Sequence, residues 1–265
     1  MIEIKGNKYK LVYLDTNAIS EISKNYKNTF INFFEYFNFF KQGDCDRYAL
    51  VTTVYNMHEL NKTRDEYKNK IIEKFDLIPV LLFEAFPQIV TTELNNDDPI
   101  LLATGAKTIM NNQFSTIFQQ LTKIEEKSNN LKQNLDKEIN LWNKERKNIS
   151  DLKSLFSSSY SFYDTHNSDH NLLFKLKSSK IFSYIKYHFI YESSKPINEN
   201  SIIDSYNSSI APFIDVYVGE RTVISWLEKS KDKYNFMTRV ECIKISEFYG
   251  KKIKTLLFPL FMGFF

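Results

Sequence analysis

Glycine and cysteine are scarce in this sequence, and their scarcity excludes several classes of site. Only 6 of the 265 residues are glycine, and the patterns G-x-x-x-x-G-K-[ST], G-x-G-x-x-G and G-x-S-x-G do not occur. Phosphate-binding loops, dinucleotide-binding turns and hydrolase elbows are therefore not expected. The 2 cysteines, Cys45 and Cys242, lie far apart without C-x-x-C spacing, which disfavours a zinc or redox site and fits a reducing, cytoplasmic setting.

Strong net charge and long apolar runs are lacking as well. The formal net charge is +3, so no basic stripe by itself predicts nucleic-acid binding, and none excludes it. The opening residues MIEIKGNKYK lack the apolar stretch of a secretory signal. The apolar segment 255–265, TLLFPLFMGFF, is interrupted by Pro259 and is shorter than the roughly 20 residues that span a bilayer. We expect no membrane span, and we expect this tail to pack on the domain or on a partner.

Apolar strands and helical stretches alternate in the first part of the chain. Residues 8–14 predict a buried strand, followed by helical stretches over 18–40 with several phenylalanines. Residues 48–53, YALVTT, predict a second strand whose two threonines could cap a helix containing Met57 and Tyr67. Strand–helix alternation of this kind is typical of an α/β sandwich with a parallel sheet.

The middle of the chain has a different character and predicts an insertion. Apolar residues recur there at three- and four-residue steps: Ile117, Leu121, Ile124, Leu131, Leu135 and Trp142. This spacing predicts a long amphipathic helix in a coiled-coil-like arm, which would stabilise or oligomerise the protein or, alternatively, clamp RNA. A Ser-, Tyr- and Asn-rich loop over 157–168 and a helix over 172–191 would follow.

The last part resumes the alternation and completes the expected fold. A helix is predicted over 201–209, a strand over 214–218, a helix over 223–229 and a strand over 239–245. We expect an α/β fold: a three-layer α/β/α sandwich with a mostly parallel sheet. Its core would comprise residues 1–94 and 201–265, with the helical insertion at 95–200.

Four acids have a reason to meet at one edge of such a sheet. Asp15 directly follows the first strand, Glu220 follows the strand over 214–218, Glu59 lies on the helix after the second strand, and Asp204 precedes the third. Ligands of parallel sheets gather at the carboxyl ends of the strands. Clustered carboxylates repel one another unless a cation joins them, and oxygen ligands without His or Cys indicate Mg²⁺ or Mn²⁺. Such an ion activates water toward a phosphodiester.

Three segments resemble the motifs of the PIN domain family of metal-dependent ribonucleases. They are LDTN at 14–17, VTTVYNMHEL at 51–60, and the stretch from Asp204 to Glu220 that contains APFIDVYVGE. The resemblance covers roughly the first 90 and the last 65 residues, and implies the three-layer PIN-like fold. The middle of the chain does not resemble the family core.

The resemblance also implies roles for individual residues. Asp15 and Glu59 would be metal ligands, and Asp204 would match the acid on the helix before the fourth strand. Glu220 stands where the family usually has Asp, and its extra methylene could weaken the site. Asp215, at the start of the same strand, would support the site or replace one of its acids.

Simpler interpretations exist for each residue. Asp15 could be a helix N-cap, Glu59 a solvated helix residue, and Glu220 the partner of Arg221 in a weak surface pair. His58, next to Glu59, would face another way. The Asp- and His-containing stretch 164–170 has metal-binding residue types, but its spacing matches no zinc pattern and indicates a solvated loop.

The joint placement of the acids favours an enzyme. We expect a Mg²⁺- or Mn²⁺-dependent endoribonuclease that cleaves single-stranded or structured RNA. Such an enzyme could serve as a toxin or as a defence nuclease. Its insertion would govern assembly, substrate access or the binding of a protein inhibitor. The alternative is a catalytically inactive PIN-like scaffold that binds partners through its helical arm and apolar tail, and the glutamate at position 220 keeps that alternative open.

Overall fold

The computed structural model describes residues 2–4, 7–24, 47–76, 80–83, 85–95, 113–128, 130–152 and 175–248. Several expected features lie outside these ranges: the phenylalanine-rich stretch at 30–40, the loop at 157–168, the Asp and His residues at 164–170, and the apolar tail at 255–265. No helix within the described ranges is both long and apolar enough to cross a membrane.

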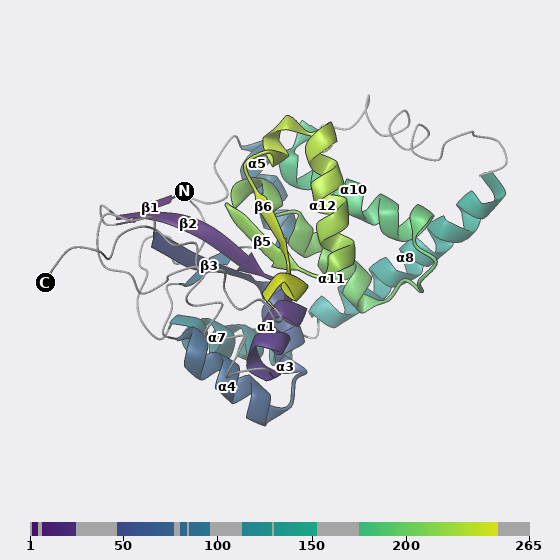
Figure 1. The fold of residues 1–265 in the computed structure, drawn as a ribbon. Coiled ribbons are helices and arrows are strands. Elements are labelled where there is room, and N and C mark those ends of the chain that lie inside the picture. The colour runs from purple at the N-terminus through teal and green to yellow at the C-terminus, as the bar shows by residue number, and fades with distance from the viewer. Residues whose placement is uncertain are drawn as a thin grey trace, which may run out of the picture.

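A mostly parallel sheet forms the centre of the fold (Figure 1). Its parallel strands are β2 (Asn7–Leu14), β3 (Arg47–Thr53), β4 (Val80–Phe83), β5 (Val216–Gly219) and β6 (Glu241–Lys244), in the spatial order β4-β3-β2-β5-β6. The short strand β1 (Ile2–Ile4) pairs antiparallel with β2. The chain thus starts at the middle of the sheet, builds one half, and then returns to β2 to build the other.

Helices cover both faces of the sheet, which confirms an α/β sandwich. One face carries α1 (Thr16–Lys24), α3 (Val54–Asn61), α4 (Asp65–Phe75) and α7 (Gln113–Ser128). The other carries α5 (Phe86–Leu94), α8 (Asn130–Leu152), α10 (Lys177–Tyr187), α11 (Glu199–Ser208) and α12 (Arg221–Lys233).

Alternating side chains of the central strands supply the two cores. On β2, Leu11 and Tyr13 belong to one cluster of buried residues, and Val12 and Leu14 to the other. This is the two-residue period of a strand that is buried on both sides. The continuous apolar run in the sequence is therefore explained by burial of both faces.

Helix boundaries differ from the sequence expectation at one point near the site. A single helix was expected through Met57 and Tyr67, but α3 ends at Asn61 and α4 begins at Asp65. Asp65 and Glu66 occupy the first turn of α4, where negative charge is favourable at a helix N-terminus. The strand β4 and the helix α5 were not predicted at all.

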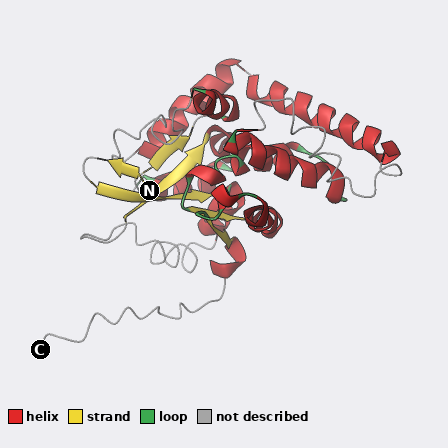
Figure 2. Cartoon of the chain, turned by 90° about the horizontal axis from the view of Figure 1, so that it is seen from above, coloured by secondary structure: helices red, strands yellow, loops and turns green. Residues whose placement is uncertain are grey.

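The insertion packs differently from the coiled-coil-like arm that its periodicity suggested. Phe114 and Phe118 of α7 join the core beside α3 and α4, whereas Leu135 and Trp142 of α8 join the core on the opposite face. The apolar stripe that looks continuous in sequence is thus divided between two layers. The longest helix, α8, reaches away from the strands beyond the helices that it contacts (Figure 2).

Acidic side chains bind the first turns of α7 and α10, two helices of the segment that was expected to be an insertion. Asp76, directly after α4, accepts the backbone N–H of Ser115 in α7 at 2.7 Å. Glu93 of α5 accepts the backbone N–H groups of Lys177 and Ser178 at 2.9 and 3.0 Å. Carboxylates at helix N-termini satisfy donors that lack partners within the helix. These contacts fix α7 and α10 onto the two faces of the sandwich.

Candidate functional site

The carboxyl ends of β2 and β5 lie at the point where the order of strand addition reverses. From β2 the chain adds β3 and β4 on one side, and it later adds β5 and β6 on the other side. These strands are neighbours, with Leu14 aligned to Val218. After β2 the chain enters α1 on one face, and after β5 it enters α12 on the other. In doubly wound sheets such a reversal is where ligands bind, because the two connections separate there.

Asp15 stands at this point and opens α1. Its backbone N–H donates to the Val218 carbonyl at 2.9 Å, and its carbonyl accepts the N–H of Ile19 at 2.9 Å. Asp15 thus occupies the N-cap position of α1. Its carboxylate accepts backbone N–H groups from Glu220 and from the first residues of α1, yet burial, followed by the charge of Glu220, raises the pKa of Asp15 to about 6.

Glu220 occupies the equivalent place at the end of β5. Its carboxylate accepts a hydrogen bond of 2.6 Å from the side-chain amide of Asn17. The preceding residue, Gly219, lies against both Asp15 and Tyr217: a β-carbon there would make an ordinary contact of 3.6 Å with Asp15 Oδ2 but a tight one of 3.1 Å with the Tyr217 ring. Glu220 is exposed, and its carboxylate contacts α1 across the junction of the two strands.

Glu59 approaches the same edge from α3. Thr53, the last residue of β3, caps α3 as its two-threonine ending suggested, accepting the N–H of Asn56 at 3.2 Å. Glu59 lies six residues further on and is partly buried, and the Thr16 hydroxyl donates to its carboxylate. Burial raises the pKa of Glu59 to about 7, and the charge of Asp15 adds to the rise.

Asp204 completes the group from α11. Burial raises its pKa well above the usual range, and the charges of Asp15, Glu59 and Glu220 raise it further, in that order. All four acids therefore lie close enough to influence one another, although they come from four separate segments. Among the described residues, none of the four forms an ion pair with Lys or Arg.

Asp215 does not join this group. It lies at the opposite end of β5, where it accepts the backbone N–H of Leu11 at 2.9 Å. Arg239 donates to its other oxygen at 3.1 and 2.9 Å. Its charge is balanced within the chain, so its contacts explain it as a residue that fixes β2, β5 and the start of β6 together.

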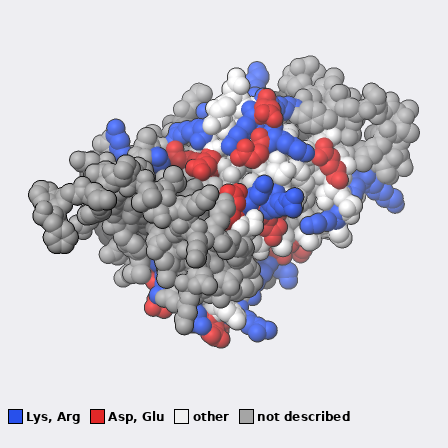
Figure 3. Space-filling model, viewed as in Figure 1, with Lys and Arg blue, Asp and Glu red and all other residues white. Residues whose placement is uncertain are grey.

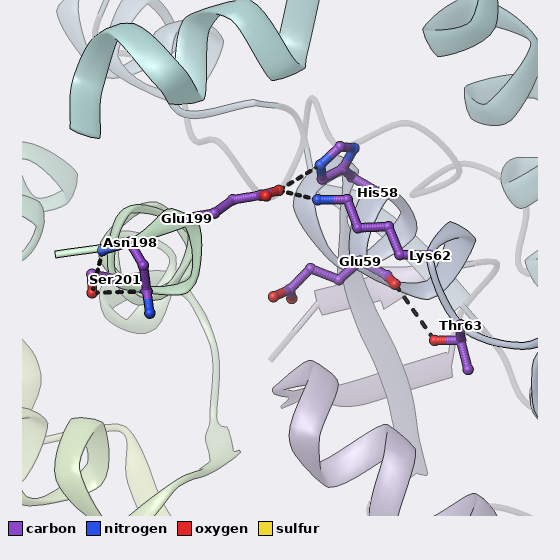
Figure 4. A network of polar contacts seen from close by, with 7 residues as sticks. All are labelled: His58, Glu59, Lys62, Thr63, Asn198, Glu199 and Ser201. Carbon is purple, nitrogen blue, oxygen red and sulfur yellow. Dashed lines mark hydrogen bonds and ion pairs between the residues drawn. The ribbon is translucent and has the colours of Figure 1, made fainter. Parts of the chain in front are cut away.

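His58 and Lys62 hold α3 to α11 beside the acids (Figure 4). His58 is buried, and its Nε2 lies 2.7 Å from Glu199 of α11. Lys62 pairs with the same carboxylate. In Figure 4 the Glu59 side chain extends toward α11 without taking part in this pairing. His58 is thus a structural contact, and the pairing positions two of the acid-bearing helices.

The ligand atoms that these acids offer are carboxylate oxygens, the type that a hard divalent cation prefers. The pKa values of Asp15, Glu59 and Asp204 are raised, and neither they nor Glu220 form an ion pair with Lys or Arg among the described residues. The charges of Lys62 and Lys195 offset only part of the rise for Glu59 and Asp204, so Mg²⁺ or Mn²⁺ would stabilise the group. Even so, no group of three or more His, Cys, Asp or Glu residues in the described ranges is arranged so that it could hold an ion directly. Ligation would therefore require the side chains to close around the ion.

Buried polar residues beneath the acids were not anticipated from the sequence. Asn56 is 1% exposed and hydrogen-bonds to both the end of β2 and the end of β3. Tyr13 and Tyr217 pack with ring centroids 4.6 Å apart. Asn56 stands three residues after the capping threonine, at the position where a capping-box partner is expected, so a signal for its helix-capping role was present. No comparable signal marked the two tyrosines.

Among the described residues on the face shown in Figure 3, Lys and Arg side chains are interspersed with Asp and Glu side chains. This agrees with the small net charge.

Comparisons with known proteins leave the site to be interpreted from its own geometry. No protein-family model, no curated protein and no solved structure matches this chain.

Proposed function

We propose that this chain is a PIN-like endoribonuclease that uses Mg²⁺ or Mn²⁺ bound by the acids at the carboxyl ends of β2 and β5. One observation carries the proposal: acids from four segments of the chain meet at the carboxyl ends of β2 and β5, where the order of strand addition to the sheet reverses. A structural role alone does not explain four neighbouring carboxylates that form no ion pair with Lys or Arg in the part of the chain that the structure describes, because their repulsion opposes folding.

The placement of the three PIN-like motifs supports the finer assignment. LDTN spans the end of β2 and the start of α1, and VTTVYNMHEL spans the end of β3 and α3. The segment from Asp204 to Glu220 runs from α11 through β5. Each motif thus delivers one or two acids to the same edge, as the family resemblance implies.

The acids would divide the work of binding. Asp15, Glu59 and Asp204 are partly or fully buried and would hold the ion, while exposed Glu220, restrained by Asn17, would contact it directly or through water. When bound, the ion supplies a Lewis acid that activates water and stabilises the charge developing on the phosphate. The raised pKa values mean that binding must displace protons near neutral pH, so affinity should increase with pH.

Single-stranded RNA, or an unpaired region of structured RNA, is the proposed substrate. Its backbone can bend so that one phosphate approaches the acids. Arg221, which is exposed and directly follows Glu220, would hold a flanking phosphate. A toxin or defence role, and control by a protein inhibitor or by self-association through the insertion, belong to the same proposal.

The direct test is cleavage of fluorescent RNAs by the purified protein. We expect cleavage with Mn²⁺ or Mg²⁺, loss of cleavage with EDTA, and loss again in Asp15→Asn. Asp136→Asn, an exposed acid of α8, is the matched control and should cleave like the unchanged protein. Inertness of the folded, unchanged protein toward single-stranded and structured RNAs with both metals would overturn the proposal.

A second candidate is a PIN-like scaffold without catalysis that binds partners through its helical arm and apolar tail. The absence of a ready-made group of three ligands among the described residues favours it. Adding Mn²⁺ separates the candidates, because an ion that binds the folded state raises the melting temperature. An increase that is lost in Asp15→Asn supports the enzyme, and no increase at millimolar Mn²⁺ supports the scaffold.

A further inference from the structure

Asn56 makes more hydrogen bonds than its position in α3 requires. Its Oδ1 accepts the backbone N–H of Thr53 at 3.2 Å. Its Nδ2 lies 2.9 Å from Thr16 Oγ1, 3.1 Å from the Tyr13 hydroxyl and 3.4 Å from the Leu14 carbonyl. The side chain is 1% exposed, so these contacts form away from water, where each is costly to lose.

The direction of these hydrogen bonds is fixed by their partners. A backbone N–H can only donate and a backbone carbonyl can only accept, so Thr53 and Leu14 determine which end of the amide is oxygen. Nδ2 must then face Thr16 Oγ1, which accepts from it. The hydrogen of the Thr16 hydroxyl is then left to donate to the neighbouring Glu59 carboxylate.

The same hydrogen-bond network extends to α11, the helix that carries Asp204. The Thr53 hydroxyl lies 2.7 Å from the side-chain oxygen of Asn207. Asn207 is on α11, three residues after Asp204, and is 1% exposed. Hydrogen bonds centred on Asn56 and Thr53 therefore connect the start of α1, the helix α3 and the helix α11.

We propose that Asn56 is a positioning residue that orients the Glu59 carboxylate through the Thr16 hydroxyl. This role rests on the proposed function in so far as Glu59 binds the ion. Apolar packing would fix where α3 lies but not where a carboxylate points, whereas a chain of directed hydrogen bonds fixes both. Residues behind metal ligands commonly act in this way.

The chain itself offers a comparison that separates positioning from helix capping. Helix α11 has the same type of capping box, in which Ser201 accepts the N–H of Asn198 at 3.4 Å and donates its own N–H to the Asn198 side chain at 3.1 Å. A serine is thus sufficient to cap. Asn56→Ser should preserve the cap of α3 but is too short to reach Thr16.

The first experiment uses the metal-free protein and is independent of any activity. The ¹³C resonance of the Glu59 carboxyl group is compared in the unchanged protein, Asn56→Ser, Thr16→Val and Thr16→Ser. Thr52→Val is the matched control, because the buried Thr52 hydroxyl has no partner among the described residues. We expect Asn56→Ser and Thr16→Val to shift the resonance in the same direction, and Thr16→Ser and Thr52→Val to leave it in place.

A folded Asn56→Ser variant whose Glu59 resonance is unchanged would overturn the positioning role. Circular dichroism establishes that each variant is folded. Asn56→Thr, which keeps a hydroxyl for the cap, adds no charge and is also too short to reach Thr16, replaces Asn56→Ser if that variant does not fold, with the same expectation.

The second experiment measures Mn²⁺ binding by calorimetry. Asn56→Ser should weaken binding about tenfold, as is typical for residues behind metal ligands, with unchanged stoichiometry, and Thr52→Val should bind like the unchanged protein. Equal affinity in Asn56→Ser and the unchanged protein would contradict the positioning role. If the unchanged protein binds no Mn²⁺, the proposed function fails, while the resonance of Glu59 still decides whether Asn56 orients it.

Discussion

The two ends of β5 show opposite treatments of an acidic residue. At the start of the strand, Asp215 receives a backbone N–H from Leu11 and two hydrogen bonds from Arg239. At its end, Glu220 lies beside Asp15, and each of these carboxylates contacts only neutral donors among the described residues. The strand is only four residues long, so the contrast arises over a short distance.

The difference in charged partners offers a criterion for separating acids with a structural role from acids that could form a binding site. Asp215 is neutralised within the chain and contributes to stability. At the other end, burial and mutual repulsion raise the pKa values of Asp15, Glu59 and Asp204. The nearby charges of Lys62 and Lys195 offset only part of this rise for Glu59 and Asp204, so the ionised acids cost stability that further positive charge would restore. Neighbouring acids whose pKa values are shifted by burial and mutual repulsion are typical of binding and catalytic sites.

The largest expected effect is on RNA cleavage, which should distinguish the acids at the two ends of β5. Asp204→Asn should lower RNA cleavage at saturating Mn²⁺ by about 100-fold or more, because it removes a proposed ligand of the ion that supplies the chemistry. Asp215→Asn should retain activity within a few-fold, measured at a temperature where both variants are folded. Similar losses in the two variants would show that the two ends of β5 do not differ in function.

The second prediction concerns the stability of the metal-free protein against pH. Folded-state pKa values of about 6 for Asp15 and about 7 for Glu59 lie above those of the unfolded chain, so the folded protein holds protons that the unfolded chain releases. The contribution of these acids should therefore be complete below about pH 4 and be lost as the pH rises to about 7. For Asp15 alone this is on the order of 3 kcal/mol.

Urea unfolding in EDTA across this pH range measures the effect. Asp204→Asn removes one of the repelling charges, so it should be more stable than the unchanged protein at pH 8 and should flatten the pH dependence. A variant that is less stable at pH 8 would mean that Asp204 is stabilised by contacts rather than opposed by repulsion.

The third prediction concerns the start of β5, where the charge of Asp215 is balanced by Arg239. Asp215→Ala should lower the free energy of unfolding by about 2 kcal/mol at pH 7, because it leaves the Leu11 N–H without its side-chain acceptor and removes the partner of Arg239. Asp215→Asn keeps an acceptor and should cost less. Chemical denaturation measures both, and a neutral Asp215→Ala would contradict the structural role.

The smallest expected effect concerns the restraint on Glu220. Asn17→Ala removes the hydrogen bond of 2.6 Å to its carboxylate and should weaken Mn²⁺ binding only a few-fold, since Glu220 is exposed and the other acids remain. Calorimetric titration with Asn61→Ala as control tests this. A loss as large as that of Asp15→Asn would make Glu220 a principal ligand.

Much of the sheet could be predicted from the sequence because its strands are apolar and end at recognisable helix starts. Residues 8–14 and 48–53 correspond closely to β2 and β3. The strand β4, Val80–Phe83, was missed because four apolar residues carry no period that separates strand from helix. The insertion was misjudged because periodicity shows that a stripe is buried, but not which layer buries it.

The candidate site was predictable to a similar degree. Asp15 and Glu220 follow strands and could be located by that rule alone. The contacts of Asp215 with Leu11 and Arg239 depend on the alignment of β2, β5 and β6, which the sequence did not define. The reach of Asn56 to Thr16 likewise depends on how α3 meets β2, so only its helix-capping contact had a local signal.

The most direct test of the central claim is anomalous diffraction from a crystal soaked in Mn²⁺. The proposed site predicts a peak at ligand distance from Asp15 and Asp204, with Glu59 turned toward it and the Asp215–Arg239 pair unchanged. Density for Mn²⁺ only elsewhere, or no peak at millimolar Mn²⁺ with the three acids still apart, would contradict the claim that these carboxylates gather to bind a dication.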